Sequence, residues 1–384
     1  MDKKTCDAFK KCGSCQMLDL PYNRQLIIKQ NKVKRLLSKY KKPEKIVGMK
    51  NPYHYRNKVQ AAFGTSRGRI ISGVYQSSSH KIVSVDSCLL EDRKADEIIT
   101  DIRKMCPGFK IKAYDEVRGT GDLRHVLVRR GFETGEIMVV LVTPRETFNR
   151  ADSFVNELLR RHPDITTVVQ NINGGFTSLV LGERQKVLFG KGYIEDVLCG
   201  LRFKISPRSF YQINPVQTKV LYNKAIGYAE LKGNELVFDA YCGIGTIGLC
   251  AAGHAKKIIG VELNPAAVKD AKQNAQLNGI ENAEFYAADA GDFMEEAAAE
   301  GWRPDVVFMD PPRAGSSRKF LKSLLRTSPQ KIVYISCNPE TMARDLKILT
   351  RDYRVEKLCP VDMFPHTEHV ETVVLMTRTE AQKG

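Results

Sequence analysis

The sequence has no long apolar segment. Its longest apolar runs, such as Ile137–Val142, have the length of a strand and fall far short of the roughly 20 residues that a membrane helix needs. The opening residues, Met1–Cys6, are polar and lead into no apolar stretch of the kind found in secretory signal peptides. We therefore expect no transmembrane helix and a cytoplasmic location.

The sequence also lacks repeats and low-complexity tracts, and it is short of acidic residues. Its 384 residues, 42% hydrophobic and 27% charged, have the composition of a globular protein of two or three domains. Sixty Lys and Arg against 44 Asp and Glu give a formal net charge of +16, which favours a polyanionic partner such as nucleic acid. A basic enzyme that its charge merely keeps in solution is the alternative. Nothing in the sequence marks the oligomeric state, and a monomer is the simplest expectation.

Apolar spacing divides the chain into three parts. Residues 1–17 hold three cysteines, and we predict that they join residues 49–203, where short alternating runs indicate strands, in a β-rich central domain. Residues 18–48 contain a predicted helix from about Tyr22 to Lys45 that we expect to pack on the C-terminal domain, residues 204–384. Between Arg24 and Lys45 there are nine basic residues and one acid, so the exposed face of this helix either meets nucleic acid or is simply solvated.

From residue 204 to residue 384, strand-like and helix-like segments alternate, which predicts an α/β domain. The expected strands are Leu236–Asp239, Ile258–Val261, Ala283–Tyr286, Asp305–Met309, Ile332–Ile335 and Val373–Met376. Helices between successive strands favour a doubly wound, mostly parallel sheet, which binds ligands at the carboxyl ends of its strands.

A glycine-rich turn follows the first of these strands. Gly243 and Gly245 let the backbone turn tightly beside a ligand. Glu262, about twenty residues later, stands where a carboxylate hydrogen-bonds a ribose diol in dinucleotide and S-adenosylmethionine (SAM) sites alike. Asp289, after the third strand, is placed to meet an adenine amine. Gly248 completes the pattern typical of nicotinamide enzymes, so a dehydrogenase stays open on the glycines alone.

The fourth strand favours a methyltransferase. It ends in Asp310-Pro-Pro, which places a carboxylate and a rigid turn in the ligand crevice. Enzymes that methylate an exocyclic amine carry an aromatic residue after the two prolines, whereas this chain has Arg313. Methylation of a carbon atom is therefore the better interpretation.

Cys337 has the chemistry that carbon methylation requires. Carbon 5 of a pyrimidine is inert until a nucleophile adds to carbon 6, and a thiolate can make that addition. Cys337 follows a strand and precedes a helix that begins near Pro339, and we expect the N-terminus of this helix to lower the pKa of the thiol. Glu371 and Glu368 are rival bases for the carbon 5 proton. Taken alone, Cys337 is more simply a buried structural thiol.

A second group of cysteines lies near the N-terminus. Cys6, Cys12 and Cys15, with Cys88 as a fourth, offer thiolates suited to tetrahedral zinc or to an iron–sulphur cluster. Only one Cys-x2-Cys knuckle is present, where zinc ribbons usually have two. We interpret the remaining thiols as structural: Cys106, Cys199, Cys242, Cys250 and Cys359.

Five stretches of the C-terminal half carry a resemblance to a known family. They are Ser209–Pro215, Asp239–Gly245, Asp310–Gly315, Ser336–Pro339 and Pro365–Glu371. In these stretches the chain resembles the RNA uracil-C5 methyltransferases, and in particular the iron–sulphur-containing 23S ribosomal RNA (uracil-5-)-methyltransferases. The resemblance implies a class I SAM-dependent methyltransferase fold, doubly wound on a seven-stranded, mostly parallel sheet, with a β-rich N-terminal and central module that binds RNA.

The resemblance also implies roles for individual residues. It makes Cys337 the nucleophile and Glu371 the general base. It places Gln212, Tyr241, Glu262 and Asp310 around SAM, to which the turn adds Gly243 and the third strand adds Asp289. It places Cys6, Cys12, Cys15 and Cys88 around a [4Fe-4S] cluster.

The implied substrate is RNA, with 23S ribosomal RNA favoured and the T-loop uridine of tRNA as the alternative. A target base must leave its stack before a thiol can reach carbon 6. Candidate RNA contacts from the central domain, which are equally well ordinary exposed strand residues, are Arg56, Asn57, Lys58, Arg124, His125 and Arg129.

One departure from the family concerns the grip on RNA. Many relatives begin with an extra RNA-binding β-barrel, whereas here the first cluster cysteine is residue 6, from which we expect no such barrel. A non-catalytic RNA-binding factor is a further alternative, and the presence of Cys337, Glu371 and Asp310 argues against it.

Overall fold

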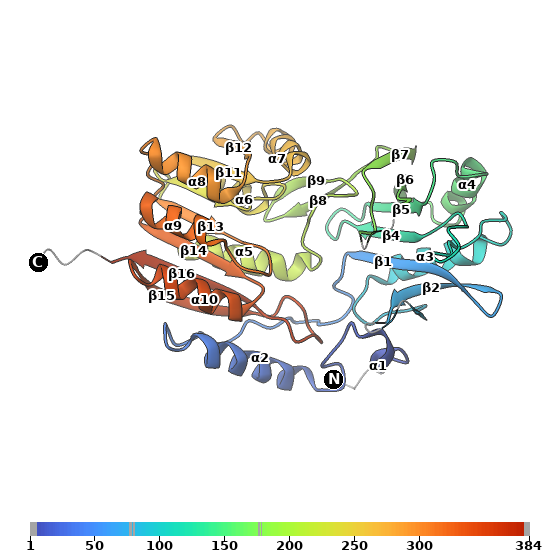
Figure 1. The fold of residues 1–384 in the computed structure, drawn as a ribbon, viewed down its shortest axis with the longest axis horizontal. Coiled ribbons are helices and arrows are strands. Elements are labelled where there is room, and N and C mark those ends of the chain that lie inside the picture. Colours follow the sequence, from blue (N-terminus) through green and yellow to red (C-terminus); the bar gives the residue numbers. More distant parts are fainter. Residues whose placement is uncertain (1–5, 77–78, 80, 176, 178, 380–384) are drawn as a thin grey trace, which may run out of the picture.

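Figure 1 shows the fold in the computed structural model, which describes residues 6–76, 79, 81–175, 177 and 179–379. The chain forms two lobes, and each lobe contains a seven-stranded sheet. Helix α2 (Tyr22–Leu37) runs along the C-terminal lobe beside α10 (Pro339–Leu349), although the two helices are far apart in the sequence. No helix in the described part of the chain combines the length and the apolar character needed to cross a membrane.

The C-terminal lobe has the strand order β12-β11-β10-β13-β14-β16-β15. Neighbouring strands from β12 to β14 pair in parallel, and β16 is antiparallel to both β14 and β15. This is the class I SAM-dependent methyltransferase fold, as predicted. The strands are β10 (Leu236–Ala240), β11 (Lys257–Glu262), β12 (Ala283–Ala287), β13 (Val306–Met309), β14 (Lys331–Ser336), β15 (Tyr353–Val361) and β16 (Glu371–Arg378).

Helices cover both faces of this sheet because successive strand residues point to opposite sides. Val237 and Ile258 pack with α5 (Pro215–Ala229), α6 (Thr246–Ala252) and α7 (Pro265–Leu277). Their neighbours Phe238 and Ile259 pack with the helices of the other layer, α8 (Ala290–Ala299), α9 (Arg318–Thr327), α10 and α2. The turns at the carboxyl ends of the parallel strands therefore lie between two buried layers.

Helix α2 is shorter than expected. The predicted helix extended to Lys45, but α2 ends at Leu37. The following segment runs beside β15, where the backbone N–H of Glu44 donates to Leu358 O at 2.8 Å and that of Val47 donates to Pro360 O at 3.0 Å. β15 lies at the edge of the sheet, and its unpaired backbone acceptors compete with the helix for these N–H groups.

The central lobe has the strand order β3-β2-β1-β4-β5-β6-β7, in which only β5 and β6 pair in parallel. Helices α3 (Arg93–Met105) and α4 (Ala151–Arg161) pack on one face of it, and α1 (Phe9–Cys12) lies near the N-terminus. The strands are β1 (Lys58–Ser66), β2 (Arg69–Tyr75), β3 (Ile82–Ser84), β4 (His125–Arg130), β5 (Ile137–Thr143), β6 (Ile165–Ile172) and β7 (Arg184–Phe189).

A two-stranded hairpin, β8 (Ile194–Leu198) and β9 (Leu201–Ile205), connects the lobes. Ile194 and Phe203 of this hairpin belong to one apolar cluster with Leu127 of the central lobe and Tyr222 of α5. The two lobes therefore share a continuous core.

Candidate active site

The glycine-rich turn opens the crevice at the carboxyl end of β10. Gly243 and Gly245 have φ of 56° and 82°, in the left-handed region that favours glycine. A Cβ at Gly243 would meet no atom within 4 Å, so the backbone at this glycine faces open space. The Asp239 carboxylate accepts from the N–H of Gly248 at 2.8 Å, which fixes the first turn of α6 against β10.

Two acidic residues stand at the ends of the neighbouring strands. The Glu262 carboxylate accepts from the N–H of Gly243 at 3.2 Å and from that of Asn264 at 2.9 Å, so it borders the glycine turn as predicted from the spacing. Asp289 follows β12 and caps α8, with one oxygen accepting from the N–H of Gly291 at 2.8 Å. A capping role accounts for this oxygen of Asp289 without any ligand.

Tyr241 and Gln212 lie at the edge of the same region. Tyr241 has a φ of 66°, and its ring centroid is 5.3 Å from that of Phe320 on α9. Gln212 is half-buried in the segment between β9 and α5. The backbone N–H of Asn57 donates to the carbonyl of Ile213, next to Gln212, at 2.9 Å, which ties this segment to the central lobe.

Asp310, Cys337 and Glu371 come together at the ends of β13, β14 and β16. Burial raises the pKa of Asp310 to about 7. Burial, with Asp310 as a second cause, holds the pKa of Glu371 well above its ordinary value. The strands explain the proximity, because Ser336 at the end of β14 pairs with Thr372, the residue after Glu371.

The pKa of Cys337 is raised overall, whereas the sequence led us to expect a lowered value. The pKa of the half-buried Cys337 thiol is raised to about 11, first by burial and then by the charges of Glu371 and Asp310. Arg313 and a backbone hydrogen bond lower this pKa but are outweighed. In this conformation the thiol form predominates at neutral pH.

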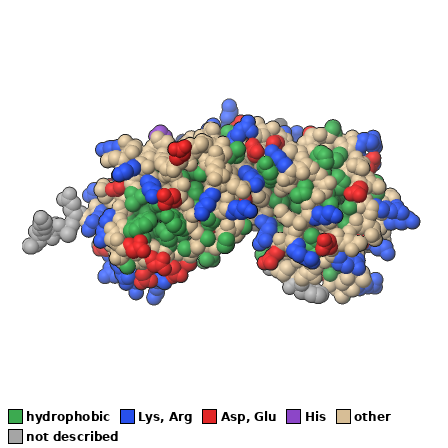
Figure 2. All heavy atoms as spheres, turned by 90° about the horizontal axis from the view of Figure 1, so that it is seen from above, with side chains coloured by type: hydrophobic (Ala, Val, Ile, Leu, Met, Phe, Trp, Pro, Cys, Tyr) green, Lys and Arg blue, Asp and Glu red, His purple; other side chains and the backbone are tan. Residues whose placement is uncertain are grey.

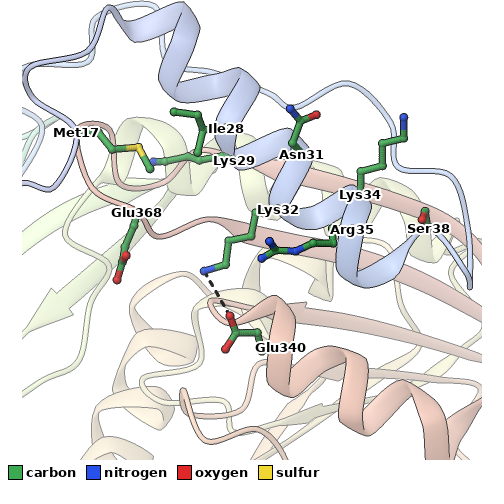
Figure 3. A pocket seen from close by; sticks show the side chains of 10 residues that line it. All are labelled: Met17, Ile28, Lys29, Asn31, Lys32, Lys34, Arg35, Ser38, Glu340 and Glu368. Carbon is green, nitrogen blue, oxygen red and sulfur yellow. Dashed lines mark ion pairs between the residues drawn. The ribbon is translucent and has the colours of Figure 1, made fainter.

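The rival bases Glu371 and Glu368 have different surroundings. The Glu371 residue is 4% exposed, and its Oε2 has no hydrogen-bond partner in the described part of the chain. Glu368 is exposed and lies in a groove beside α2, as Figure 3 shows. Of these two glutamates, Glu371 alone is among the charges that raise the pKa of Cys337.

Several residues that border this site had no predicted role in it. Arg313 Nη2 lies 3.4 Å from His369 Nδ1, and the Asn338 amide donates to Arg313 O at 3.3 Å. Behind the loop that leads to Glu371, Lys29 Nζ donates to Asp362 Oδ1 at 2.6 Å and to Phe364 O at 2.9 Å. One signal for Lys29 existed, because it lies on the same helical face as the buried Gln25, Val33 and Leu37 at intervals of four residues.

The four N-terminal-region cysteines lie in one corner of the structure. All four are partly exposed free thiols. Cys15 and Cys88 pack around the buried Tyr55 and Leu90, while Cys6 borders a cleft with Ser87 and Leu89, the neighbours of Cys88. Within residues 6–379, as far as they are described, no three His, Cys, Asp or Glu side chains reach the geometry of a metal site.

Three of the six candidate RNA contacts are buried and already engaged within the protein. Arg124 donates to Asn173 O at 2.6 Å and Arg129 donates to Ser209 O at 2.9 Å. His125 is 5% exposed, and burial lowers its pKa to about 4. As placed here, these three side chains support the central lobe and its junction, and they offer little surface to RNA.

The other three are placed differently. Arg56 pairs through its backbone with Glu91 and Leu90, beside the cysteine corner. Lys58 is half-buried, and its pKa is lowered to about 8 by burial and then by Arg129. Asn57 is fully buried, and both polar atoms of its side chain lack a hydrogen-bond partner in the described part of the chain.

Comparison with known proteins relates this geometry to a family. The sequence matches the family described as tRNA (uracil-5-)-methyltransferase over residues 21–379. An uncharacterized RNA methyltransferase of Clostridium tetani is 43% identical over 377 residues, which cover 97% of this chain and 82% of that protein. Another, from Bacillus cereus, is 42% identical over 381 residues, 98% of this chain and 83% of that protein.

A solved structure extends the comparison to both lobes. The tRNA (uracil-54, C5)-methyltransferase of Pyrococcus abyssi, in complex with S-adenosyl-L-homocysteine, has a TM-score of 0.79 and 31% sequence identity with this chain. The similarity covers 95% of this chain and 86% of that one. Since the family match spans nearly the whole sequence and the fold agrees, the chain belongs to the tRNA (uracil-5-)-methyltransferase family.

Proposed function

We propose that this protein transfers a methyl group from SAM to carbon 5 of a uridine in RNA through a transient bond between Cys337 and carbon 6. The observation that supports it most directly is the grouping of Cys337, Asp310 and Glu371 in one crevice. A thiol beside two acids at the edge of a methyltransferase sheet suits a base that must be activated before it is methylated.

The proposed chemistry gives each residue one step. The Cys337 thiolate adds to carbon 6, and the electron pair moves to carbon 5, which takes the methyl group. Glu371, as a carboxylate, then accepts the carbon 5 proton, and elimination returns the electron pair to sulphur. SAM supplies the electrophilic methyl group on a sulphonium.

SAM fits the residues at the carboxyl edge of the sheet. We propose that Glu262 binds the ribose hydroxyls beside the open backbone of Gly243 and that Asp289 meets the adenine amine through its second oxygen. Gln212, Tyr241 and Asp310 border the same crevice and complete the proposed set. Support comes from the Pyrococcus abyssi neighbour, whose structure contains S-adenosyl-L-homocysteine.

For the RNA target, we propose 23S ribosomal RNA. The cysteine spacing resembles that of the ribosomal RNA branch of the family, and this resemblance is the argument for it. Transfer RNA is the second candidate, because the Pyrococcus abyssi neighbour methylates uracil 54 of tRNA. Lys58 and Asn57 stay in the proposal as contacts of the flipped nucleotide, since an unsatisfied buried amide suits a ligand.

The test is direct methylation of both RNAs. Purified protein is incubated with methyl-labelled SAM and with unmodified 23S ribosomal RNA or tRNA transcripts, and nuclease fragments are mapped by mass spectrometry. We expect 5-methyluridine at a defined position of ribosomal RNA. Labelling of tRNA alone assigns the second candidate, and binding of RNA without labelling of either favours a non-catalytic RNA-binding factor.

We further propose that Cys6, Cys12, Cys15 and Cys88 hold a [4Fe-4S] cluster. The four thiols occupy one corner, although their side chains would have to converge to reach ligand distance. Such a cluster would fasten the N-terminal segment to the central lobe. Anaerobically purified protein should be brown with about four irons per chain; colourless protein containing zinc would contradict the assignment.

A further inference from the structure

A groove separates α2 from the N-terminal end of α10. Figure 3 shows that Lys32 and Arg35 of α2 point toward α10, whereas Lys34 points away from it. Glu340 lies at the start of α10 and Glu368 lies on the loop opposite. The groove has a volume of about 850 Å³ and is open to solvent.

The groove lies next to the proposed site of chemistry. Glu340 is the third residue after Cys337, and Glu368 is the third residue before Glu371. The chain segments that hold Cys337 and Glu371 therefore also supply one residue each, Glu340 and Glu368, to the lining of the groove. A polynucleotide whose uridine reaches Cys337 passes close to α2.

The charge of α2 and the segment after it suits a polyanion. The exposed basic residues are Arg24, Lys34, Arg35, Lys39, Lys41, Lys42 and Lys45. None of these seven is within ion-pair distance of a carboxylate in the described part of the chain. Two acids oppose them in the groove, of which Glu340 is paired with Lys32 at 3.9 Å and Glu368 lies at the inner end. The α2 side of the groove is therefore basic at Lys34 and Arg35, and the exposed segment after α2 adds further positive charge.

The helix is fixed to the segment that leads to Glu371, the first residue of β16. Lys29 and Asp362 form an ion pair with both side chains fully buried, and the Tyr22 hydroxyl donates to the same carboxylate at 2.8 Å. The Gln25 amide lies 3.0 Å from His366 Nδ1, and its carbonyl oxygen accepts from the His366 N–H at 2.9 Å. RNA held on α2 would thus have a fixed position relative to Glu371.

We propose that the rim of this groove, formed by Lys34 and Arg35, together with the basic segment that follows α2 in the chain, binds the sugar-phosphate backbone of RNA flanking the target uridine. This inference rests on the proposed function, which makes RNA the substrate. The exposed Ile27 and Ile28 on the same helix provide apolar surface beside the phosphates. Binding at such a surface is sequence-independent and falls steeply with salt, because each neutralised phosphate releases counterions.

The test compares two double substitutions. Lys34→Gln with Arg35→Gln removes two charges from the rim. Lys232→Gln with Lys256→Gln removes two exposed charges at the opposite, amino-terminal edge of the parallel strands, neither of which forms an ion pair with any described residue, and serves as the matched control. The RNA dissociation constant is measured against salt concentration for the transcript that the wild type methylates, or for unmodified tRNA if it methylates none.

We expect the rim variant to bind RNA about 5- to 20-fold more weakly, with a slope of log Kd against log salt that is shallower by about one to two. The control variant should stay within about twofold of wild type, because net charge alone acts weakly at that distance. SAM binding by calorimetry should be unchanged in both variants, which verifies folding.

The experiment distinguishes failure of the RNA-binding surface from failure of the proposed function. Equal affinity and equal salt slope in the rim and control variants overturn the docking surface, even when methylation is normal. Loss of affinity in the rim variant alone, together with no methyl transfer by the wild type, supports the docking surface and overturns the proposed function.

Discussion

At the scale of single residues, one thiol and two carboxyl groups share a crevice. Burial raises the pKa of Cys337, Asp310 and Glu371; the charge of Asp310 further raises the pKa of Glu371, and both carboxylates further raise that of Cys337. The chemistry nevertheless needs a thiolate and a carboxylate. Arg313 is the one cation whose charge favours the Cys337 thiolate among the causes of its shift.

This crowding predicts a rate that rises with pH. Only the thiolate attacks, so kcat/KM should increase about tenfold per pH unit below the Cys337 pKa of about 11. Removing the neighbouring cation raises that pKa, so Arg313→Gln should move the rising limb to higher pH. A profile measured under single-turnover conditions that stays flat between about pH 7 and 10 would show that ionisation of Cys337 does not limit the reaction.

Glu371→Gln should separate addition from release. The amide cannot take the carbon 5 proton, so we expect a methylated RNA–protein adduct that survives denaturing gel electrophoresis and at least about 100-fold slower turnover. Cys337→Ala should give no adduct and no turnover but bind SAM normally. Glu368→Gln is the matched control, and if it traps the adduct instead, the base has been assigned to the wrong glutamate.

At the scale of elements, α2 and the loop before β16 form one unit. The Lys29–Asp362 pair, with Tyr22 and the Phe364 carbonyl, places a buried polar network between them. Burial lowers the pKa of Lys29, while Asp362 opposes that effect. Such a network fixes a unique arrangement, and the removal of one partner leaves a charge without compensation.

Lys29→Met should therefore lower the free energy of unfolding by about 3–5 kcal/mol. The exposed pair of Lys32 with Glu340 provides the comparison, and Lys32→Met should cost only about 0–1 kcal/mol. Denaturant unfolding followed by circular dichroism measures both. Equal effects in the two variants would mean that the buried pair adds nothing beyond a surface contact.

For the whole molecule, the two lobes share a core through the β8–β9 hairpin. Figure 2 shows Lys and Arg side chains over both lobes and around the constriction between them, which accords with the net charge of +16. A nucleic acid that contacts both lobes would experience this field along its length.

Ligand binding should stabilise the folded chain selectively. SAM at about 100 times its dissociation constant should add about 2.7 kcal/mol of stability and raise Tm. NAD+ and NADP+ at the same concentration should leave Tm unchanged, although Gly243, Gly245 and Gly248 complete a dinucleotide-like pattern. Stabilisation by a nicotinamide nucleotide and not by SAM would revive the dehydrogenase interpretation.

Local pattern was sufficient for the catalytic fold. The strands predicted around Leu236, Ile258 and Ile332 occur in the structure. Short apolar runs between turn residues are buried as strands of the sheet, so the local pattern was enough to place them. Pattern failed at the end of α2, where a strand edge distant in sequence takes up the N–H groups of Glu44 and Val47. It also failed for Arg124 and Arg129, because a charged residue in a strand gives no sign of the carbonyl that will bind it.

The sequence by itself determined the order of strands and helices, the glycine turn and the residue types that stand at the strand ends, since these depend on near neighbours along the chain. Tertiary structure decided the raised pKa of Cys337 and the burial of Glu371, whose Oε2 has no hydrogen-bond partner among the described residues. It also decided the attachment of α2 to the loop before β16. Those properties arise from desolvation and from groups brought together from different elements, 27 to 34 residues apart for Cys337 with Asp310 and Glu371 and 333 apart for Lys29 with Asp362, which no local pattern contains.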